Sequence, residues 1–126
     1  MTTRKASHLK LKLQLMCGDE IAMGPGKAEL LRQIDRTGSI SGAGRAMGMS
    51  YRRAWLLADT MNRCFRHPLV EAHPGSGSKA GARLTAAGRS ALEAYEGLVE
   101  ATERGMVGTH SRALENAVRA TPRAPR

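Results

Sequence analysis

The sequence predicts an α+β fold that is mostly α-helical, with a small antiparallel sheet and a long C-terminal helix. Three observations predict it. Apolar residues recur at helical spacing in several stretches, and glycine, serine or proline residues bound these stretches. Short apolar runs flank a glycine-rich segment, as paired strands do. At 126 residues with only 3% aromatic side chains, the chain is sized for one domain with an aliphatic core.

A first strand is predicted to begin at His8, because leucines alternate with polar residues from there to Leu15. The short apolar run 21–23 is a further candidate strand. A single strand needs a partner, and the first strand is expected to find it in the strand-like runs 69–72 and 83–85.

A first helix is predicted to begin near Pro25, whose missing N–H costs nothing in the first turn, and to end at Gly38. Gly26 and Lys27 are reminiscent of a phosphate loop. No glycine stands five residues before Gly26, however, and Ala28 occupies the Ser/Thr position, so the segment is interpreted as a helix start. The expected buried face consists of Ala28, Leu30, Leu31 and Ile34.

Residues 39–66 predict two helices joined by a tight turn. Ser39 is expected to cap the first helix, Gly48 to end it and Ser50 to cap the longer second helix. Gly44 has no side chain, so the second helix can cross the first closely at this point. Two helices that cross at such a turn form the helix-turn-helix unit that reads DNA.

The start of the second helix, about 50–66, carries the residues predicted to contact DNA. Arg52 and Arg53 are expected to read bases in the major groove, because one guanidinium can bond both major-groove acceptors of a guanine. Ser50 and Tyr51 are expected to position the helix. Trp55 is a further candidate, with packing against the first helix as the alternative. The two arginines would otherwise only solvate a helix face, but the caps and the turn favour the DNA contact.

The glycine-rich segment, about 74–83, is predicted to be a wing between two short strands, which makes the fold a winged helix-turn-helix. Lys79 and Arg83 are its cations, expected to hold phosphate along the backbone or in the minor groove. A flexible solvent loop is the alternative.

Thr85 is predicted to cap a long helix over 86–104, with one apolar face and several glutamates elsewhere. Part of the apolar face closes the domain, and the rest is expected to pair two copies into a homodimer. The recognition helices would then lie roughly 34–36 Å apart, one turn of DNA. The predicted organisation is a flexible N-terminus over 1–7, a DNA-binding and dimerisation domain over 8–104, and a basic, weakly structured tail over 105–126.

The net charge of +9 predicts a polyanionic partner, and nucleic acid fits better than a membrane because no apolar run approaches the roughly 20 residues of a bilayer span. The lack of a visible signal peptide and the presence of only two cysteines predict a cytoplasmic protein. Cys64 and His67 form half of a metal-binding pattern that Cys17 or His73 would have to complete, so no metal site is predicted. No catalytic motif is present, and no enzymatic activity is expected.

Three runs of the sequence resemble the N-terminal DNA-binding domain of the molybdate-responsive ModE-type transcriptional regulators. They are Gly24-Pro25-Gly26-Lys27-Ala28-Glu29-Leu30-Leu31, then Ile34-Asp35 with Thr37-Gly38-Ser39-Ile40-Ser41, and Met49-Ser50-Tyr51-Arg52-Arg53-Ala54-Trp55. The resemblance covers about 8–104 and implies a winged helix-turn-helix that dimerises through this domain. It places Ser50, Tyr51, Arg52 and Arg53 on the recognition helix and 75–82 on the wing.

Full-length members of that family carry C-terminal domains that bind molybdate, and the chain leaves no room for them. A stand-alone member with no cofactor is therefore expected, or one whose effector-binding domain lies on a separate chain. The sequence as a whole predicts a bacterial-type, sequence-specific DNA-binding transcriptional regulator that acts as a homodimer on double-stranded DNA. The alternatives are a non-specific architectural, nucleoid-type DNA-binding protein and a protein-interaction module that has lost DNA binding.

Overall fold

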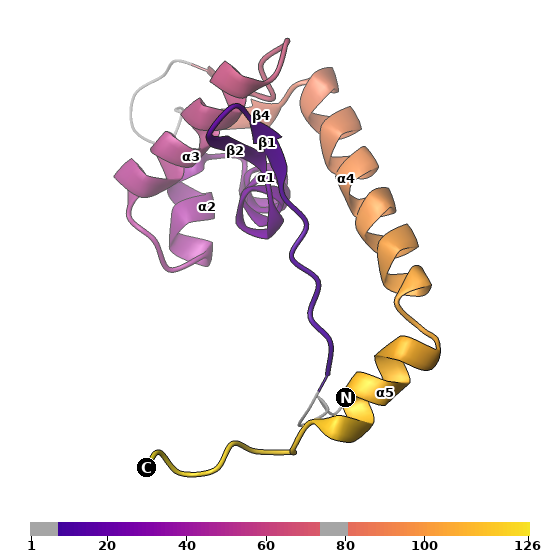
Figure 1. Cartoon of the computed structure of the whole chain (residues 1–126). Helices are drawn as coiled ribbons and strands as arrows, with labels where there is room; N and C mark the ends of the chain where they lie inside the picture. The colour runs from indigo at the N-terminus through magenta and orange to yellow at the C-terminus, as the bar shows by residue number, and fades with distance from the viewer. Residues whose placement is uncertain (1–7, 74–80) are drawn as a thin grey trace. The chain divides into compact units, whose positions relative to one another are not determined.

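The computed structural model describes residues 8–73 and 81–126 (Figure 1). The chain divides into two units, one formed by residues 12–97 and the other by 1–11 with 98–126. The elements in chain order are β1 (Leu15–Cys17), β2 (Glu20–Met23), α1 (Pro25–Thr37), α2 (Ile40–Ala46), α3 (Tyr51–Cys64), β3 (Val70–His73), β4 (Gly81–Leu84), α4 (Ala86–Gly105) and α5 (Thr109–Ala117). The fold is α+β and mostly helical, which confirms the predicted class.

The strands form two separate antiparallel pairs in the part of the chain that is described. In the first pair β1 lies against β2, with Leu15 opposite Met23 and Cys17 opposite Glu20. In the second pair β3 lies against β4, and Val70 is opposite Leu84. The candidate strand at 21–23 is confirmed as β2, and the two strand-like runs beside the glycine-rich segment are confirmed as β3 and β4.

The predicted first strand is wrong in its extent and in its partner. Residues 8–14 have no regular structure, and only Leu15–Cys17 forms a strand, which pairs with β2 rather than with the later runs. Side chains of Leu9 and Leu15 are 40% and 54% exposed. The alternating leucines therefore do not form a continuous buried face, and such a face is what usually holds an alternating segment in a sheet.

Helix α1 begins and ends where the sequence predicts. Pro25 is its first residue, and Gly38 follows its last residue with a left-handed φ of 77°, donating its N–H to the Ile34 carbonyl oxygen. Both ends follow from local chemistry, since proline suits the first turn and glycine tolerates positive φ.

Helices α2 and α3 are capped as expected. Ser39 Oγ accepts the Gly42 N–H at 2.8 Å, and Ser50 Oγ accepts the Arg53 N–H at 3.1 Å. Gly48 in the turn between the helices has a φ of 69°. A Cβ on Gly44 would lie 3.3 Å from the Cβ of Ala54 on α3. The predicted close crossing of the two helices at this glycine is confirmed.

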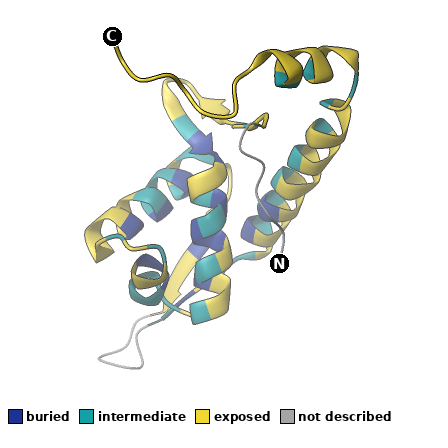
Figure 2. Ribbon diagram, turned by 90° about the horizontal axis from the view of Figure 1, so that it is seen from below, coloured by how far each residue is buried: buried dark blue, intermediate teal, exposed yellow. Residues whose placement is uncertain are grey.

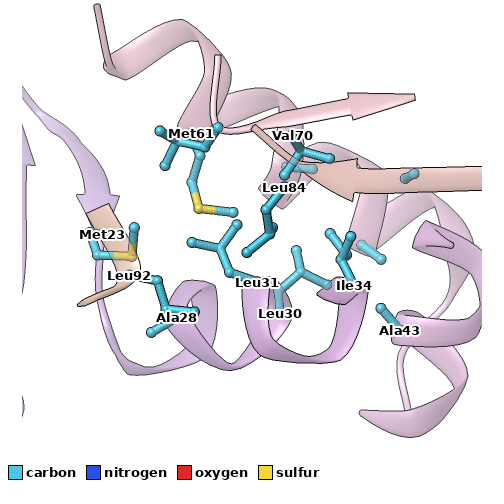
Figure 3. Close-up of a cluster of buried hydrophobic side chains, with 14 residues drawn as sticks. Met23, Ala28, Leu30, Leu31, Ile34, Ala43, Met61, Val70, Leu84 and Leu92 are labelled. Carbon is cyan, nitrogen blue, oxygen red and sulfur yellow. The ribbon is translucent and has the colours of Figure 1, made fainter. Parts of the chain in front are cut away.

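The buried core in the described part of residues 12–97 is aliphatic, as predicted, with methionine beside the aliphatic side chains (Figure 3). The half-buried rings of Phe65 and Tyr95 pack against this core from outside. Helix α1 supplies the centre of the core, and residues of β2, α2, α3, the β3–β4 pair and α4 surround that centre (Figure 3). No polar or charged side chain is buried among the described residues. The buried cluster consists of Met23, Ala28, Leu30, Leu31, Ile34, Ala43, Ala54, Ala58, Met61, Leu69, Val70, Ala82, Leu84 and Leu92.

Thr85 caps α4, also as predicted. Its Oγ1 accepts the Gly88 N–H at 3.0 Å and donates to the Pro68 carbonyl oxygen at 2.6 Å. Only Gly88 and Leu92 of this helix are buried, and the helix is otherwise exposed or half-buried (Figure 2). Helix α5 lies in the segment expected to be a weakly structured tail and is exposed on most of its surface. Across the described residues, no helix combines the length and apolar composition needed to cross a membrane.

Candidate functional site

The first two turns of α3 present the residues that the sequence singles out. Arg52 and Arg53 are exposed, and Tyr51 and Trp55 are 57% and 45% exposed. Tyr51 and Trp55 are one helical turn apart and therefore share a face of the helix. Ser50 contributes through its cap, because its Oγ is engaged by the Arg53 N–H. The helix thus places two guanidinium groups and two aromatic rings at one exposed end; we call Tyr51, Arg52, Arg53 and Trp55 the α3 face.

The two predicted wing cations have different outcomes. Lys79 lies outside the described residues. Arg83 lies on β4 and donates from Nε to Glu71 Oε1 at 2.6 Å, directly across the hairpin. Both side chains are exposed, and water screens such a pair, so it contributes little to stability. The carboxylate of Glu71 nevertheless offsets the positive charge of Arg83, which the sequence predicted to be an unpaired cation available for phosphate.

The structure also contains a pocket of about 440 Å³ that the sequence did not reveal. Its volume lies within the usual range of small-molecule sites. Apolar side chains form most of the wall, and two thiols, a guanidinium and an imidazole are the polar groups. We call it the thiol pocket; its lining comprises Leu15–Cys17 of β1, Ala22 of β2, residues 64–67 and Leu69 after α3, and Ala87 of α4.

Asn62 fixes the segment that forms one wall of the thiol pocket. Its Oδ1 accepts the N–H groups of Leu69 and Val70 at 2.8 and 3.1 Å, and its Nδ2 donates to the Val70 carbonyl oxygen at 2.9 Å. Helix α3 ends at Cys64, and Phe65 has extended backbone. Residues 65–68 therefore connect the end of α3 to the start of β3, which the hydrogen bonds of Asn62 hold in place. Sequence reasoning missed Asn62, because nothing local marks a side chain that bonds backbone seven or eight residues ahead.

The electrostatics of the thiol pocket are set by partial burial and by its two sulfurs. Partial burial raises the pKa of the Cys64 thiol, and its hydrogen bond with the Cys17 thiol raises it further. Cys64 is consequently protonated at neutral pH. Arg66 and His67 are exposed and lie on the same wall.

Cys64 and His67 are the half metal pattern seen in the sequence. Cys17 does approach it, since it lines the same pocket, whereas His73 does not line it. In the described parts of the chain, no three or more His, Cys, Asp or Glu side chains are grouped so as to hold a metal ion.

Comparison with known proteins finds relatives whose names refer to molybdenum. No protein-family model matches it. The chain is 38% identical over 102 residues to the molybdenum-pterin-binding protein MopA of Rhodobacter capsulatus, which covers 81% of the chain and 37% of MopA. It is 40% identical over 92 residues to MopB of the same organism, also named a molybdenum-pterin-binding protein, covering 73% of the chain and 34% of MopB. It is 33% identical over 96 residues to the DNA-binding transcriptional dual regulator ModE of Escherichia coli K12, covering 76% of the chain and 35% of ModE.

The chain thus spans about a third of the length of the relatives it matches. The names of MopA and MopB correct the functional prediction. Three predictions are wrong in the light of relatives named for molybdenum-pterin binding: membership of the DNA-binding domain of ModE-type regulators, the role of a sequence-specific DNA-binding regulator, and the absence of a cofactor. The physical reason is that a helix-turn-helix pattern predicts local geometry, whereas function depends on a site that the fold only supports.

Proposed function

We propose that the chain binds an anionic molybdenum-pterin ligand in the thiol pocket. The observation that carries the proposal is the combination, in one pocket, of apolar walls, two sulfurs and two basic side chains. The names of MopA and MopB supply the ligand class. Those names describe whole proteins of which this chain matches about a third, so the chemistry of the pocket is the support for extending this ligand class to the chain.

The pocket residues suit the two ends of such a ligand. A pterin is a flat heteroaromatic ring system, and the apolar side chains of Met16 and Phe65 offer it surface to cover. A molybdenum–oxo group is anionic, and the planar guanidinium of Arg66 can bond two of its oxygens at once. His67 is a second donor on the same wall. We assign the pocket a binding role and the chain no enzymatic activity.

Arg66→Ala is expected to weaken binding of molybdate, the first probe, roughly tenfold or more, because it removes charge-assisted hydrogen bonds. Isothermal titration calorimetry of the whole chain measures this, with free pterin as a second probe whose binding changes less. Arg36→Ala on α1 is the matched control, since it removes the same charge outside the pocket lining. Binding of neither probe, or equal losses in both variants, would show that the pocket has another role.

We also propose double-stranded DNA as a partner of the α3 face. In support, Arg52 and Arg53 lie exposed beside Tyr51 and Trp55 on a capped helix, and the chain carries a net charge of +9. ModE of Escherichia coli, one of the relatives, is named a DNA-binding protein. For the fold itself we propose that α2 and α3 form a helix-turn-helix beside the β3–β4 hairpin, supported by the Ser39 and Ser50 caps and the Gly48 turn. Neither sequence specificity nor regulation of transcription is implied.

The double variant Arg52→Ala, Arg53→Ala is expected to weaken binding of a random-sequence duplex at least tenfold, and to lower the slope of log affinity against log salt by about two. Fluorescence polarisation with a labelled duplex, at about 50 to 200 mM salt, gives both quantities. Arg104→Ala, Arg112→Ala removes the same charge from residues 98–126 and should change little. Equal losses in the two double variants would mean that only overall charge matters, and the α3 face would be excluded.

Three expectations remain as proposals beside these. We propose a homodimer, supported by the exposed apolar side chains of Leu98, Val107, Leu114 and Val118, and sedimentation at micromolar concentration tests it. A separate chain that binds the effector is proposed as a further partner.

A cytoplasmic location is proposed because both cysteines are free, as is usual in a reducing compartment.

A further inference from the structure

The two cysteines of the chain come from distant parts of the sequence and meet at the thiol pocket. Cys17 is the last residue of β1, and Cys64 is the last residue of α3. Both line the pocket, Cys17 is exposed, Cys64 is half-buried, and neither forms a disulfide. The two thiols therefore line one cavity, and the exposed Cys17 is open to reagents in solution.

We infer that Cys17 and Cys64 form a reversible disulfide that closes the thiol pocket and thereby controls its occupancy. The control of ligand binding rests on the proposed function, whereas formation of the disulfide and closure of the pocket do not. The bond would join the β1–β2 hairpin covalently to the end of α3, so that one wall of the pocket is pulled onto the other. It would also consume both sulfur donors.

The oxidant is a small-molecule disulfide such as oxidised glutathione. The exposed Cys17 thiolate attacks one sulfur of this disulfide, forming a mixed disulfide and releasing one glutathione thiolate. Cys64 then loses its proton and attacks the Cys17 sulfur, forming the Cys17–Cys64 bond and releasing the second glutathione thiolate. The two cysteines together lose two electrons and two protons, and oxidised glutathione is reduced to two thiols.

The raised pKa of Cys64 determines which step is slow. Burial, the largest cause of the raised pKa of Cys64, and the nearby Glu20 carboxylate persist when Cys17 carries glutathione, with Arg63 acting in the opposite direction, so the attack of Cys64 on the mixed disulfide is expected to limit the overall rate. Ring closure should therefore accelerate as the pH rises toward the pKa of this thiol. The exposed position of Cys17 favours it as the residue that meets the oxidant first.

The test treats the full chain with oxidised glutathione. The expected product is a single chain, not cross-linked to another, that has lost two hydrogens by mass and carries no reactive thiol and no bound glutathione. Cys17→Ser and Cys64→Ser should each give only a glutathione adduct or an unmodified thiol. A wild-type chain that carries glutathione on both cysteines, or forms only intermolecular disulfides, would overturn the inference.

Closure is measured without any ligand through the modification of histidines by diethyl pyrocarbonate. His67 lines the pocket, and the exposed His110 on α5 serves as an internal control. Oxidation is expected to lower the modification rate of His67 several-fold relative to His110. An unchanged ratio would overturn closure even if the disulfide forms. Failure of molybdate or pterin to bind the reduced chain would refute the proposed function but would leave disulfide formation and closure standing on these measurements.

Discussion

Gly88→Ala is expected to lower the free energy of unfolding by about 3 kcal/mol, because the new methyl group overlaps backbone that has no room to move. A Cβ at this position would overlap the Leu69 carbonyl oxygen and lie 3.0 Å from its carbonyl carbon. The same oxygen accepts the Thr85 N–H at 2.9 Å, and the hydroxyl of Thr85 bonds Pro68. The start of α4 is therefore fixed against residues 68–69, and the helix has to move away to accept the methyl group.

Gly97→Ala is the matched control in the same helix, where a Cβ meets no atom within 4 Å. It should be neutral or stabilise the chain by up to about 1 kcal/mol, the usual gain when alanine replaces glycine inside a helix. Urea denaturation followed by circular dichroism gives both values. Equal stability of the two alanine variants would mean that α4 does not pack closely against Leu69.

The helices were predictable from the sequence because their signals are local. Pro25 and Gly38 bound α1, and Ser39 and Ser50 cap the next two helices, each through contacts within three or four residues. Strand pairing is not local, and the sequence therefore placed the partner of β1 in the wrong segment. The alternating leucines from His8 to Leu15 match a strand in period, but period alone does not supply a neighbouring strand or a layer to cover it.

The candidate sites divide along the same line. The sequence identified the α3 face because Tyr51, Arg52, Arg53 and Trp55 occupy adjacent turns of one helix. It did not identify the thiol pocket, whose sulfurs come from β1 and from the end of α3. It also did not identify Glu71 as the partner of Arg83, since that pair depends on the register of the β3–β4 hairpin. Contacts within one helix follow from spacing, whereas contacts between elements require the fold.

Asn62→Ala is expected to lower the free energy of unfolding by about 2–3 kcal/mol. The substitution removes three hydrogen bonds and leaves the N–H groups of Leu69 and Val70 and the carbonyl of Val70 without their partner. Each bond contributes about 0.5–1.5 kcal/mol, and an unsatisfied buried group costs more. Leu69 and Val70 are themselves buried, so water does not readily replace the amide. Asn116→Ala, at an exposed position on α5, should change stability by no more than about 0.5 kcal/mol.

Asn62→Asp distinguishes loss of the Asn62 hydrogen bonds from loss of side-chain packing. A carboxylate keeps the acceptor for the Leu69 and Val70 N–H groups but loses the donor to the Val70 carbonyl, so its stability should lie between those of wild type and Asn62→Ala. Thermal and urea denaturation rank the three chains. If Asn62→Asp is as unstable as Asn62→Ala, the two accepted hydrogen bonds do not hold the strand start. The hydrogen bonds of Asn62 to Leu69 and Val70 also hold the end of the segment 65–68, so their loss should loosen the pocket wall that carries Arg66 and His67. Ligand affinity should therefore fall in the same order as stability.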